Sequence, residues 1–482
     1  MKKQILLILI SLFVGISLNA QNYFYGTTSE GGANDLGTIF RTDVNSQNFE
    51  KLYDFTNANG GNPRAGLTLA NNGKLYGFTT TGGQIVNPGA GIALGTFFEF
   101  DPLTNTFVVI EYIDDQSPMG NIFHNSPTLS SDGLLYMASE EFGLVSFDGI
   151  LSSFNTSTGV ITVIDTFTNF FGQPKSKLLE ASDGNLYVTT FNGGSSNIGA
   201  IVRYNKATSS LERLHSSTGN EFRNSFNNQL FEASNGVLYG SSREGGDSQQ
   251  GCVFKINKDG TGYQNIFSMV SGITDEGSNP EGGFVEKNGL IYGTTTEEEV
   301  HGLNSGTIYT VNINTNTLDF VNTLDLEGRR PLGTFIESTN ERLYVSCEEG
   351  GGSNKGSIIE LNTLNGAVTQ RYSFDGINGF KPKQNELTLV DFSILNINDF
   401  EVNNSMITIF PNPSSDYFEL KIDKAIEIKN IEIYNLSGKL VKNDLPVNNS
   451  RITVSDLANG MYIITIGLKN GKSYSKKIII KN

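Results

Sequence analysis

The sequence predicts an all-β protein: a seven-bladed β-propeller whose ring is closed by a strand from the C-terminal end of the repeat region, followed by a small Ig-like β-sandwich. Two observations lead to this fold. A motif built on an apolar residue and a tyrosine recurs seven times at near-constant spacing. No window of ten or more residues shows the 3.6-residue period of an amphipathic helix. The expected domains are a signal peptide (1–20), the propeller (21–390), a linker (391–404) and the sandwich (405–482).

Composition excludes several classes of protein. The chain has 482 residues and a net charge of −16, which argues against a nucleic-acid partner. With two cysteines and three histidines it is neither a disulfide scaffold nor a Cys/His zinc array. We expect Cys252 and Cys347 to be unpaired and packed as small apolar residues, because they lie in different repeats. The alternative, a redox pair, lacks the Cys-x-x-Cys spacing.

The N-terminus has the features of a secretory signal peptide. Lys2 and Lys3 precede an apolar run over 5–18, and Ala20 offers a cleavage point. A membrane anchor is the alternative, but the run is shorter than the ~20 residues that a spanning helix needs. We expect no transmembrane segment in the mature chain.

The seven repeats are centred on tyrosines. Their spacings are 51, 60, 51, 52, 53 and 52 residues, and the tyrosines are Tyr25, Tyr76, Tyr136, Tyr187, Tyr239, Tyr292 and Tyr344. A fixed period of about 52 residues indicates one supersecondary unit per repeat.

The second repeat shows the four strands expected of each unit. Residues 67–70 form the first strand, and Asn71-Asn72-Gly73 is a hairpin turn. Strands over 75–80, 95–100 and 107–113 follow, with a glycine-rich loop and an Asp-Pro turn between them. The Ser-Asp-Gly segments 130–133 and 181–184 resemble sialidase Asp-boxes but lack the closing tryptophan, and we interpret them as hairpin turns. Four strands per unit favour a propeller, which protects its strand edges by radial repetition.

The two ends of the repeat region complement each other. The first repeat begins at its tyrosine strand and lacks a first strand, whereas residues 386–390, which follow the last repeat, match the first strand of the other units. We therefore expect this segment to complete the first blade. An open solenoid is the alternative, and it gives no reason for this complementary truncation.

Two repeat families share these motifs. Leu75-Tyr76-Gly77, followed by Gly82-Gly83, and the segment Gly37-Thr38-Ile39-Phe40 resemble the GloVer tandem repeat of bacterial surface proteins over about residues 21–390. The order of motifs is also similar to kelch, although the kelch tryptophan is absent. Repeats three and six depart from the pattern, with Glu140-Glu141 and 297–299 in place of the paired glycines. The resemblance implies a propeller and assigns no catalytic residue.

The C-terminal module has its own strand pattern. Alternating apolar residues predict strands over 407–410, 417–422, 431–434, 451–454, 461–466 and 477–480, which suits a small β-sandwich. Its motifs resemble the type A C-terminal sorting domain of the type IX secretion system. The matching residues are Pro411, Asn412, Pro413, Gly438, Lys439, Gly460 and Tyr462. This resemblance implies a Bacteroidota-type exporter as the partner of 405–482, and a secreted or cell-surface location. A plain Ig-like binding domain is the alternative.

A possible binding surface lies in the loops after the second and fourth strands, which fall on one face of a propeller. A glutamate stands five residues after the repeat tyrosine in five units, as Glu30, Glu141, Glu244, Glu297 and Glu349. One interpretation is solvated charge that keeps a secreted protein soluble. The other is an acidic, oxygen-rich mouth for a cation such as Ca²⁺ or for a basic or hydroxyl-rich partner. No Ca²⁺-binding motif is present, so we predict no cofactor.

Catalytic motifs are missing. His124, His215 and His301 lie in different repeats at unmatched positions, and neither Gly-x-Ser-x-Gly nor His-Glu-x-x-His occurs. We expect a non-enzymatic surface propeller that binds a glycan or a protein partner. A secreted polysaccharide hydrolase or lyase is the alternative, since a pair of carboxylates can form in three dimensions. A purely structural surface protein is the third hypothesis.

Overall fold

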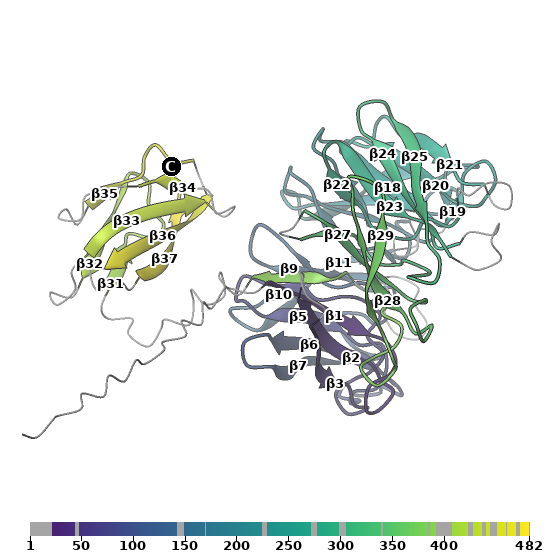
Figure 1. Cartoon of the computed structure of the whole chain (residues 1–482), viewed down its shortest axis with the longest axis horizontal. Coiled ribbons are helices and arrows are strands. Elements are labelled where there is room, and N and C mark those ends of the chain that lie inside the picture. Colours follow the sequence, from purple (N-terminus) through teal and green to yellow (C-terminus); the bar gives the residue numbers. More distant parts are fainter. Residues whose placement is uncertain are drawn as a thin grey trace, which may run out of the picture. The chain divides into compact units, whose positions relative to one another are not determined.

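The computed structural model describes residues 22–43, 48–141, 149–168, 170–223, 229–270, 277–297, 305–338, 341–383, 386–391, 407–422, 428–435, 440–443, 451–458, 460–468 and 473–481. Every regular element within these ranges is a β-strand (Figure 1). The chain divides into two compact units, one over Asn22–Val390 and one that contains the strands from Ile407 onward.

Among its described residues, the first unit has seven four-stranded sheets, numbered here by the order of their repeat tyrosines. Sheet 1 has the strand order β3-β2-β1-β30 and joins β1 (Asn22–Thr28), β2 (Thr38–Asp43) and β3 (Phe49–Asp54) to β30 (Thr388–Asp391). The strands at the start of the repeat region thus share a sheet with a strand from its end.

The other six sheets take their strands in chain order. They are β4 (Thr68–Leu69), β5 (Leu75–Phe78), β6 (Ala93–Asp101) and β7 (Thr106–Asp114) in sheet 2; β8 (Thr128–Leu129), β9 (Leu135–Ala138), β10 (Gly149–Asn155) and β11 (Val160–Phe167) in sheet 3; β12 (Leu179–Glu180), β13 (Leu186–Thr189), β14 (Ala200–Asn205) and β15 (Ser210–Ser216) in sheet 4; β17 (Phe231–Glu232), β18 (Leu238–Ser242), β20 (Cys252–Ile256) and β21 (Gln264–Ser268) in sheet 5; β22 (Val285–Lys287), β23 (Leu290–Thr294), β24 (Thr307–Asn312) and β25 (Thr317–Thr323) in sheet 6; β26 (Ile336–Glu337), β27 (Leu343–Cys347), β28 (Ser357–Leu361) and β29 (Val368–Ser373) in sheet 7. A two-stranded sheet pairs β16 (Phe222–Arg223) with β19 (Glu244–Gly245).

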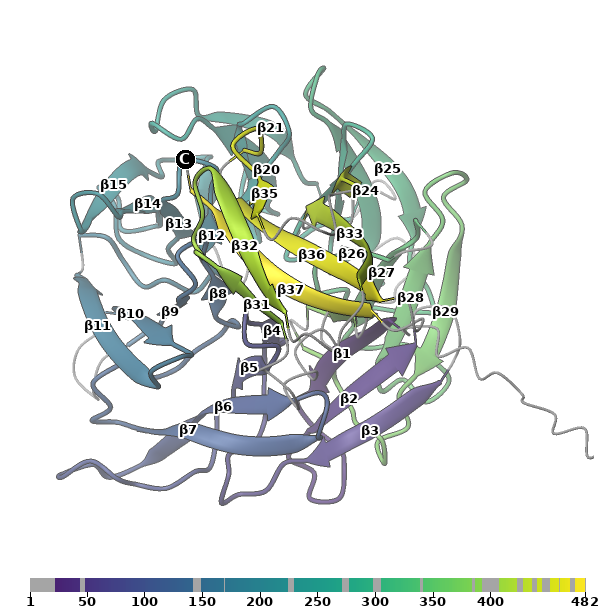
Figure 2. The same ribbon diagram turned by 90° about the vertical axis from the view of Figure 1, so that its left-hand side faces the viewer.

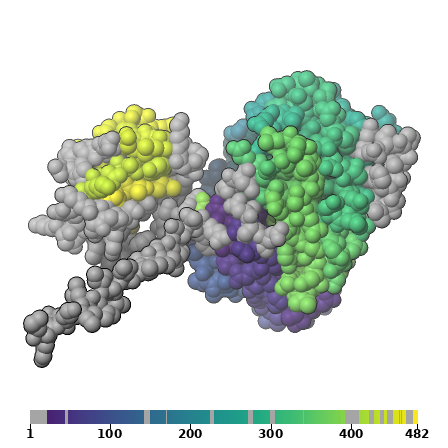
Figure 3. Space-filling model, in the orientation of Figure 1, coloured from purple at the N-terminus to yellow at the C-terminus, as the bar shows by residue number. Residues whose placement is uncertain are grey.

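The sheets follow one another around a common centre, with the short first strands inside and the long fourth strands outside (Figure 2). Sheets 7 and 1 are neighbours, because Phe24 and Phe40 share a buried cluster with Tyr344, Ile358 and Phe374. The space-filling view shows the residues of the last repeat beside those of the first (Figure 3). Equivalent clusters fill the space between other consecutive sheets, so each hydrophobic core belongs to two repeats.

The repeat tyrosine is the anchor of each unit. All seven tyrosines are buried, and burial of an aromatic ring of this size stabilises the fold by about 2–3 kcal/mol. The hairpin turn before the strand supplies a partner for the hydroxyl group: Tyr136 donates to Asp132 at 2.9 Å and Tyr187 donates to Asp183 at 2.8 Å. The Ser-Asp-Gly segments are therefore turns, as predicted.

The glycine that begins the third-strand motif has a steric role. Gly95 has a φ of +115°, and a Cβ atom there would lie 2.0 Å from the carbonyl oxygen of Thr79. Gly37 is in the same position in sheet 1, where the corresponding distance to the Thr28 oxygen is 2.1 Å. Because a side chain would collide with this backbone oxygen, each repeat has a glycine at or near the start of its third strand.

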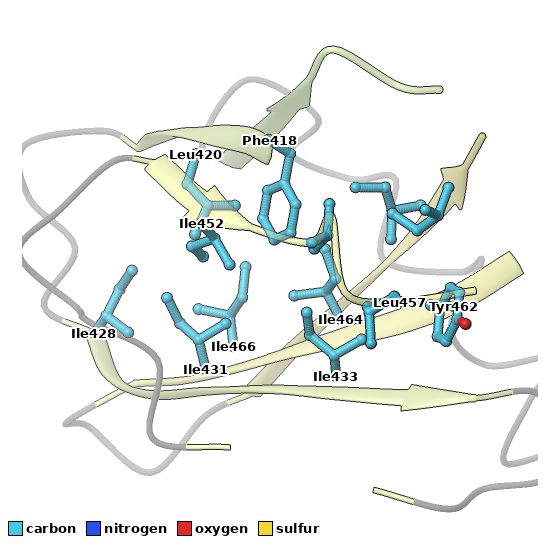
Figure 4. Packing of buried hydrophobic residues seen from close by; sticks show 13 residues of the cluster. Phe418, Leu420, Ile428, Ile431, Ile433, Ile452, Leu457, Tyr462, Ile464 and Ile466 are labelled. Carbon is cyan, nitrogen blue, oxygen red and sulfur yellow. The ribbon is translucent and has the colours of Figure 1, made fainter. Parts of the chain in front are cut away.

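The second unit has two sheets around one core. One joins β31 (Ile407–Phe410), β32 (Tyr417–Ile422) and β35 (Arg451–Thr453); the other has the order β34-β33-β36-β37, with β33 (Ile428–Asn435), β34 (Leu440–Lys442), β36 (Gly460–Leu468) and β37 (Ser473–Ile480). Side chains from both sheets meet in this core, with Phe418 and Ile452 facing Ile431, Ile464 and Ile466 (Figure 4). The strands at 407–410 and 417–422 have the predicted bounds, and β34 was not predicted because its three residues show too short an alternation.

Candidate functional site

The loops that follow the tyrosine strands are tied to the crossovers, the segments that lead from the fourth strand of one sheet to the first strand of the next. The backbone of Glu30 pairs with Phe380, with N···O distances of 3.0 and 2.8 Å. Glu141, Glu297 and Glu349 form the same bridge with Asn121, Ser278 and Arg329, and Glu244 pairs with Arg223 in the two-stranded sheet. The five predicted glutamates therefore occupy equivalent places at one end of the sheets.

Their side chains are half-buried, and several lie beside cations. Glu30 forms an ion pair with Lys381 at 2.9 Å. Glu349 lies 3.6 Å from Arg330 and 3.8 Å from Arg329, and Glu297 lies 3.9 Å from Arg243. Among the described residues there is no group of three or more His, Cys, Asp or Glu side chains suited to a metal ion. This end of the sheets therefore carries both signs of charge.

The residue just before this glutamate position is the more informative one. We call it the rim position: the fourth residue after each repeat tyrosine, namely Ser29, Thr80, Glu140, Phe191, Arg243, Thr296 and Glu348. In sheets 1, 2 and 6 its hydroxyl group donates to a crossover carbonyl, that of Lys381 (3.0 Å), Asn62 (2.8 Å) and Asn279 (3.0 Å) respectively. A serine or threonine at the rim position thus fastens the crossover to the sheet.

Sheets 3, 4, 5 and 7 depart from this arrangement. Glu140 of sheet 3 is buried and accepts from two crossover side chains: its Oε2 contacts His124 Nε2, and its Oε1 lies 2.6 Å from Lys175 Nζ. Burial alone would raise the pKa of Glu140, but His124 and Lys175 outweigh it and lower the pKa. Lys175 also lies 4.0 Å from the ring centroid of Phe191, the rim residue of sheet 4.

Arg243 is the rim residue of sheet 5. Its Nε lies 3.0 Å from Oε1 of Glu281, a crossover residue that is nearly buried, while 43% of the Arg243 side chain is exposed. Burial raises the pKa of Glu281 to about 7, against the opposing effect of Arg243 and Arg330. Glu281 thus holds the Nε edge of the guanidinium, and Nη2 of the same group lies 3.9 Å from Oε1 of Glu297.

Glu348 is the rim residue of sheet 7 and is also nearly buried. It lies 3.3 Å from Arg330 and 3.5 Å from Lys383, which come from two successive crossovers. We call the four departing rim residues and their partners the inner arc: Glu140, Phe191, Arg243, Glu348, His124, Lys175, Glu281, Arg330 and Lys383. The arc combines half-buried cations, buried carboxylates and an aromatic ring, and such a combination can bind a polar ligand.

The sequence analysis singled out the residue that follows the rim position, and it did not single out the rim residue itself. The regular glutamates are the ones that repeat, and their backbones make the repeated bridge. The rim residues differ from sheet to sheet and were not predicted. In sheets 3 and 7 the sequence does show a second acid next to the regular glutamate, as Glu140-Glu141 and Glu348-Glu349. Glu281, Arg330 and Lys383 gave no sequence signal, because their partners are far away in the chain.

The histidines and cysteines have separate environments. His215 lies 3.0 Å from Glu221 and stacks on Tyr263, far in the chain from His124, and His301 lies outside the described residues. Cys252 and Cys347 are free and buried, as expected.

The predicted sorting residues lie in the second unit. Asn412, between the exposed Pro411 and Pro413, accepts the backbone N–H of Ile479 at 2.9 Å, and Tyr462 donates to the Ala458 carbonyl at 2.9 Å. Gly460 begins β36, and Gly438 and Lys439 lie outside the described residues. Residues 410–414 therefore pack against the last strand, β37, through Asn412 and through Ser414, whose N–H donates to the Ile479 carbonyl at 2.8 Å.

Comparison with known families identifies both units. A repeat family described as the Gloeobacter/Verrucomicrobia repeat matches residues 13–181 and 173–410, which together make up most of the chain. The chain belongs to this family. The tandem-repeat resemblance of the tyrosine motifs is confirmed in this form, and the likeness to kelch stays a prediction.

A second family match covers the C-terminal unit. Residues 408–481 match the secretion system C-terminal sorting domain. This type IX sorting domain confirms export and an outer cell-surface location for the Gloeobacter/Verrucomicrobia repeat protein. The predicted signal peptide lies outside the described residues. Among the described residues, no helix is long and apolar enough to span a membrane.

Solved structures similar to this chain are β-propeller-like. The periplasmic gluconolactonase PpgL of Pseudomonas aeruginosa is 17% identical with a TM-score of 0.52, over 77% of this chain and 99% of its own. A proposed 6-phosphogluconolactonase of Bacteroides fragilis is 16% identical with a TM-score of 0.52, over 78% and 99%. At this identity the similarity establishes the fold alone. No curated protein matches the chain.

Proposed function

We propose that residues 21–390 form a closed seven-bladed β-propeller in which β30 completes the first blade. A contact at the centre supports closure: Glu386, two residues before β30, forms an ion pair with Lys177 of the crossover into sheet 4 and accepts from Thr334 of the crossover into sheet 7 at 3.1 Å. The proposal includes a signal peptide over 1–20, a linker over 391–404 and the sorting sandwich over 405–482.

This propeller binds a ligand or partner, a glycan or a protein, at the end of the sheets that carries the inner arc. The observation that carries the proposal is the change at the rim position. Three sheets keep the hydroxyl group that fastens a crossover, and four replace it with an acid, an aromatic ring or an arginine. Residues that break a structural rule of their own repeat are expected at functional sites.

The five regular glutamates form the outer border of this surface. Their backbones are held by the crossover bridges, one residue after each rim position. Such carboxylates accept hydrogen bonds from ligand hydroxyl or amide groups.

A polysaccharide hydrolase or lyase is the second candidate. The pKa of about 7 at Glu281 favours it, because a carboxyl group with that pKa can act as a general acid or base near neutral pH.

A glycan array and a pull-down with the mature full-length chain test the proposal. We expect binding that is lost in Arg243→Thr and retained in Thr80→Ser, a conservative change at a rim residue that keeps its hydroxyl group. Binding that is equal in both variants, or absent from both assays, would refute a site at the inner arc. Incubation of each bound glycan with the protein, followed by chromatography of the products, decides between binding alone and turnover.

A further inference from the structure

We infer that the inner arc binds a saccharide through a single carboxylate group of the ligand, with Arg243 as the anchor. This inference rests on the proposed function and names the class of ligand. It is carried by the arrangement of Arg243, Arg330 and Lys383 over two nearly buried carboxylates.

Arg243 is positioned to receive an anion. Glu281 holds its Nε at 3.0 Å, and because Glu281 is nearly buried, the arginine is fixed from the protein side. The side chain of Arg243 remains 43% exposed, more than any other charged side chain of the arc for which an ion pair is described. A guanidinium group fixed along one edge presents its remaining N–H groups in a planar fork that matches a carboxylate.

The charge balance beneath the surface also favours an anion. Arg243, Arg329, Arg330 and Lys383 pair with four carboxylates, those of Glu281, Glu297, Glu348 and Glu349, so the cations and carboxylates of this set are equal in number. The raised pKa of Glu281 shifts this balance toward positive charge near neutral pH, because a fraction of its carboxyl groups is protonated.

The border of the arc limits the ligand to one negative charge. Glu297 lies 3.9 Å from Arg243, and Glu349 lies 3.6 Å from Arg330. A second or third anionic group on the ligand would meet these carboxylates and be repelled. Hydroxyl groups beside the ligand carboxylate would instead donate to them.

A sugar acid suits Arg243 and the two bordering carboxylates better than a peptide does. It carries one carboxylate for the arginine and several hydroxyl donors for Glu297 and Glu349. The C-terminal carboxylate of a peptide is flanked by few hydrogen-bond donors. Phe191, on the neighbouring sheet, adds an aromatic ring of the kind that saccharides contact.

Isothermal titration calorimetry with the mature full-length chain tests this inference. The probes are 3′-sialyllactose, a glucuronate-containing disaccharide, lactose, a heparin oligosaccharide and a short peptide with a free C-terminus. We expect at least one of the two monocarboxylate sugars to bind, and lactose, heparin and the peptide to bind at least tenfold more weakly.

Two arginine variants locate the site. Arg371 is a matched control, because it is 38% exposed and its Nη2 lies 2.5 Å from the nearly buried Glu360. It lies in β29, away from the rim positions. We expect Arg243→Gln to weaken the sugar-acid affinity at least tenfold and Arg371→Gln to leave it unchanged.

The outcomes separate this inference from the proposed function. If lactose binds as tightly as the sugar acids and Arg243→Gln abolishes both, the binding face stands and the anionic class is wrong. If heparin or the peptide binds most tightly, the single-carboxylate saccharide is likewise overturned. If no probe binds and the glycan array is also blank, both proposals fail.

Discussion

At Glu281, burial raises the pKa of the carboxyl group by more than the nearby Arg243 lowers it. The carboxyl group lies 3.0 Å from Arg243, yet its pKa is raised to about 7 because it is nearly buried. At Glu140 the balance is reversed, and His124 and Lys175 lower the pKa despite burial. Two glutamates of one surface thus respond to pH in opposite directions.

Glu281 predicts a pH dependence of stability. Its pKa is higher in the folded than in the unfolded chain, so between about pH 4.3 and 7 the folded state binds more protons, and this contribution to stability falls as the pH rises. The slope reaches at most about 1.4 kcal/mol per pH unit. We expect Glu281→Gln to lose stability less steeply than the wild type from pH 5 to pH 8, measured by urea unfolding. Identical slopes would show that Glu281 ionises normally.

Ile122 is a second residue whose environment opposes its type. Its φ is +56°, a left-handed conformation that a β-branched residue rarely adopts, whereas the equivalent crossover residues Asn62 and Asn279 adopt φ values of 52° and 55°. We expect Ile122→Asn to raise the free energy of unfolding by about 1 kcal/mol, because asparagine tolerates this conformation. Chemical denaturation measures the change, and Asn62→Ile should shift stability the other way. A less stable Ile122→Asn protein would show that the packing of Ile122 outweighs its backbone strain.

At the scale of the element, the four-stranded sheets depend on one close backbone approach. The glycine before the third strand lets that strand approach the end of the tyrosine strand, as at Gly95 and Gly37. In sheets 3 and 4 the hairpin turn accepts the hydrogen bond of the tyrosine hydroxyl group. The first strands are shorter than predicted. A strand was expected over residues 67–70, but β4 spans only Thr68–Leu69, because only these two residues pair with β5.

Gly95 tests this requirement. We expect Gly95→Ala to lower the free energy of unfolding by about 3 kcal/mol or more, since the added Cβ would lie 2.0 Å from the Thr79 oxygen at a φ of +115°. Gly91→Ala is the control in the same loop region, where the nearest atom would be 3.8 Å from the Cβ and the change should stay within about 0.5 kcal/mol. Urea denaturation followed by circular dichroism measures both. Equal stability of the two variants would contradict the steric role.

At the scale of the whole molecule, the strand β30 links the two ends of the repeat region. Leu387, next to β30, packs in one cluster with Phe24 and Phe40 of sheet 1 and Tyr344 of sheet 7. This cluster therefore contains residues from both ends of the repeat region.

Leu387→Ala tests the junction. We expect a loss of about 2–5 kcal/mol in the free energy of unfolding, the usual range for a buried leucine. Leu364→Ala provides the control, because Leu364 is 90% exposed in a hairpin turn of sheet 7 and its loss should change stability by less than about 0.5 kcal/mol. Guanidinium unfolding of the two variants is the measurement. A wild-type value for Leu387→Ala would mean that β30 contributes nothing to the folded unit.

The two cysteines report on global unfolding. Burial raises the pKa of both Cys252 and Cys347 to about 12, and thiolate formation is therefore suppressed at neutral pH. We expect no labelling by iodoacetamide in the native protein at pH 8 and two labels per chain in 6 M guanidinium, counted by mass spectrometry. Rapid native labelling of one cysteine would reveal local opening of sheet 5 or sheet 7.

The sequence by itself determined the repeats, their period, the all-β class and the sorting domain. These follow from local patterns: a tyrosine strand, a hairpin turn and a glycine recur in order, and each pattern is complete within one repeat or one module. The five regular glutamates were also found, since a fixed offset from the tyrosine places them at equivalent ends of the sheets.

Only the tertiary structure decided which charges form the candidate site. Arg243 meets Glu281 and Glu348 meets Lys383 across 38 and 35 residues of chain, because successive crossovers converge at one end of the sheets. The role of the rim position follows from the hydrogen bonds that the hydroxyl groups of Ser29, Thr80 and Thr296 donate to crossover carbonyls. A sequence pattern records which residues recur, but the energy of a charge depends on its burial and its neighbours, and those are set by how the sheets pack together.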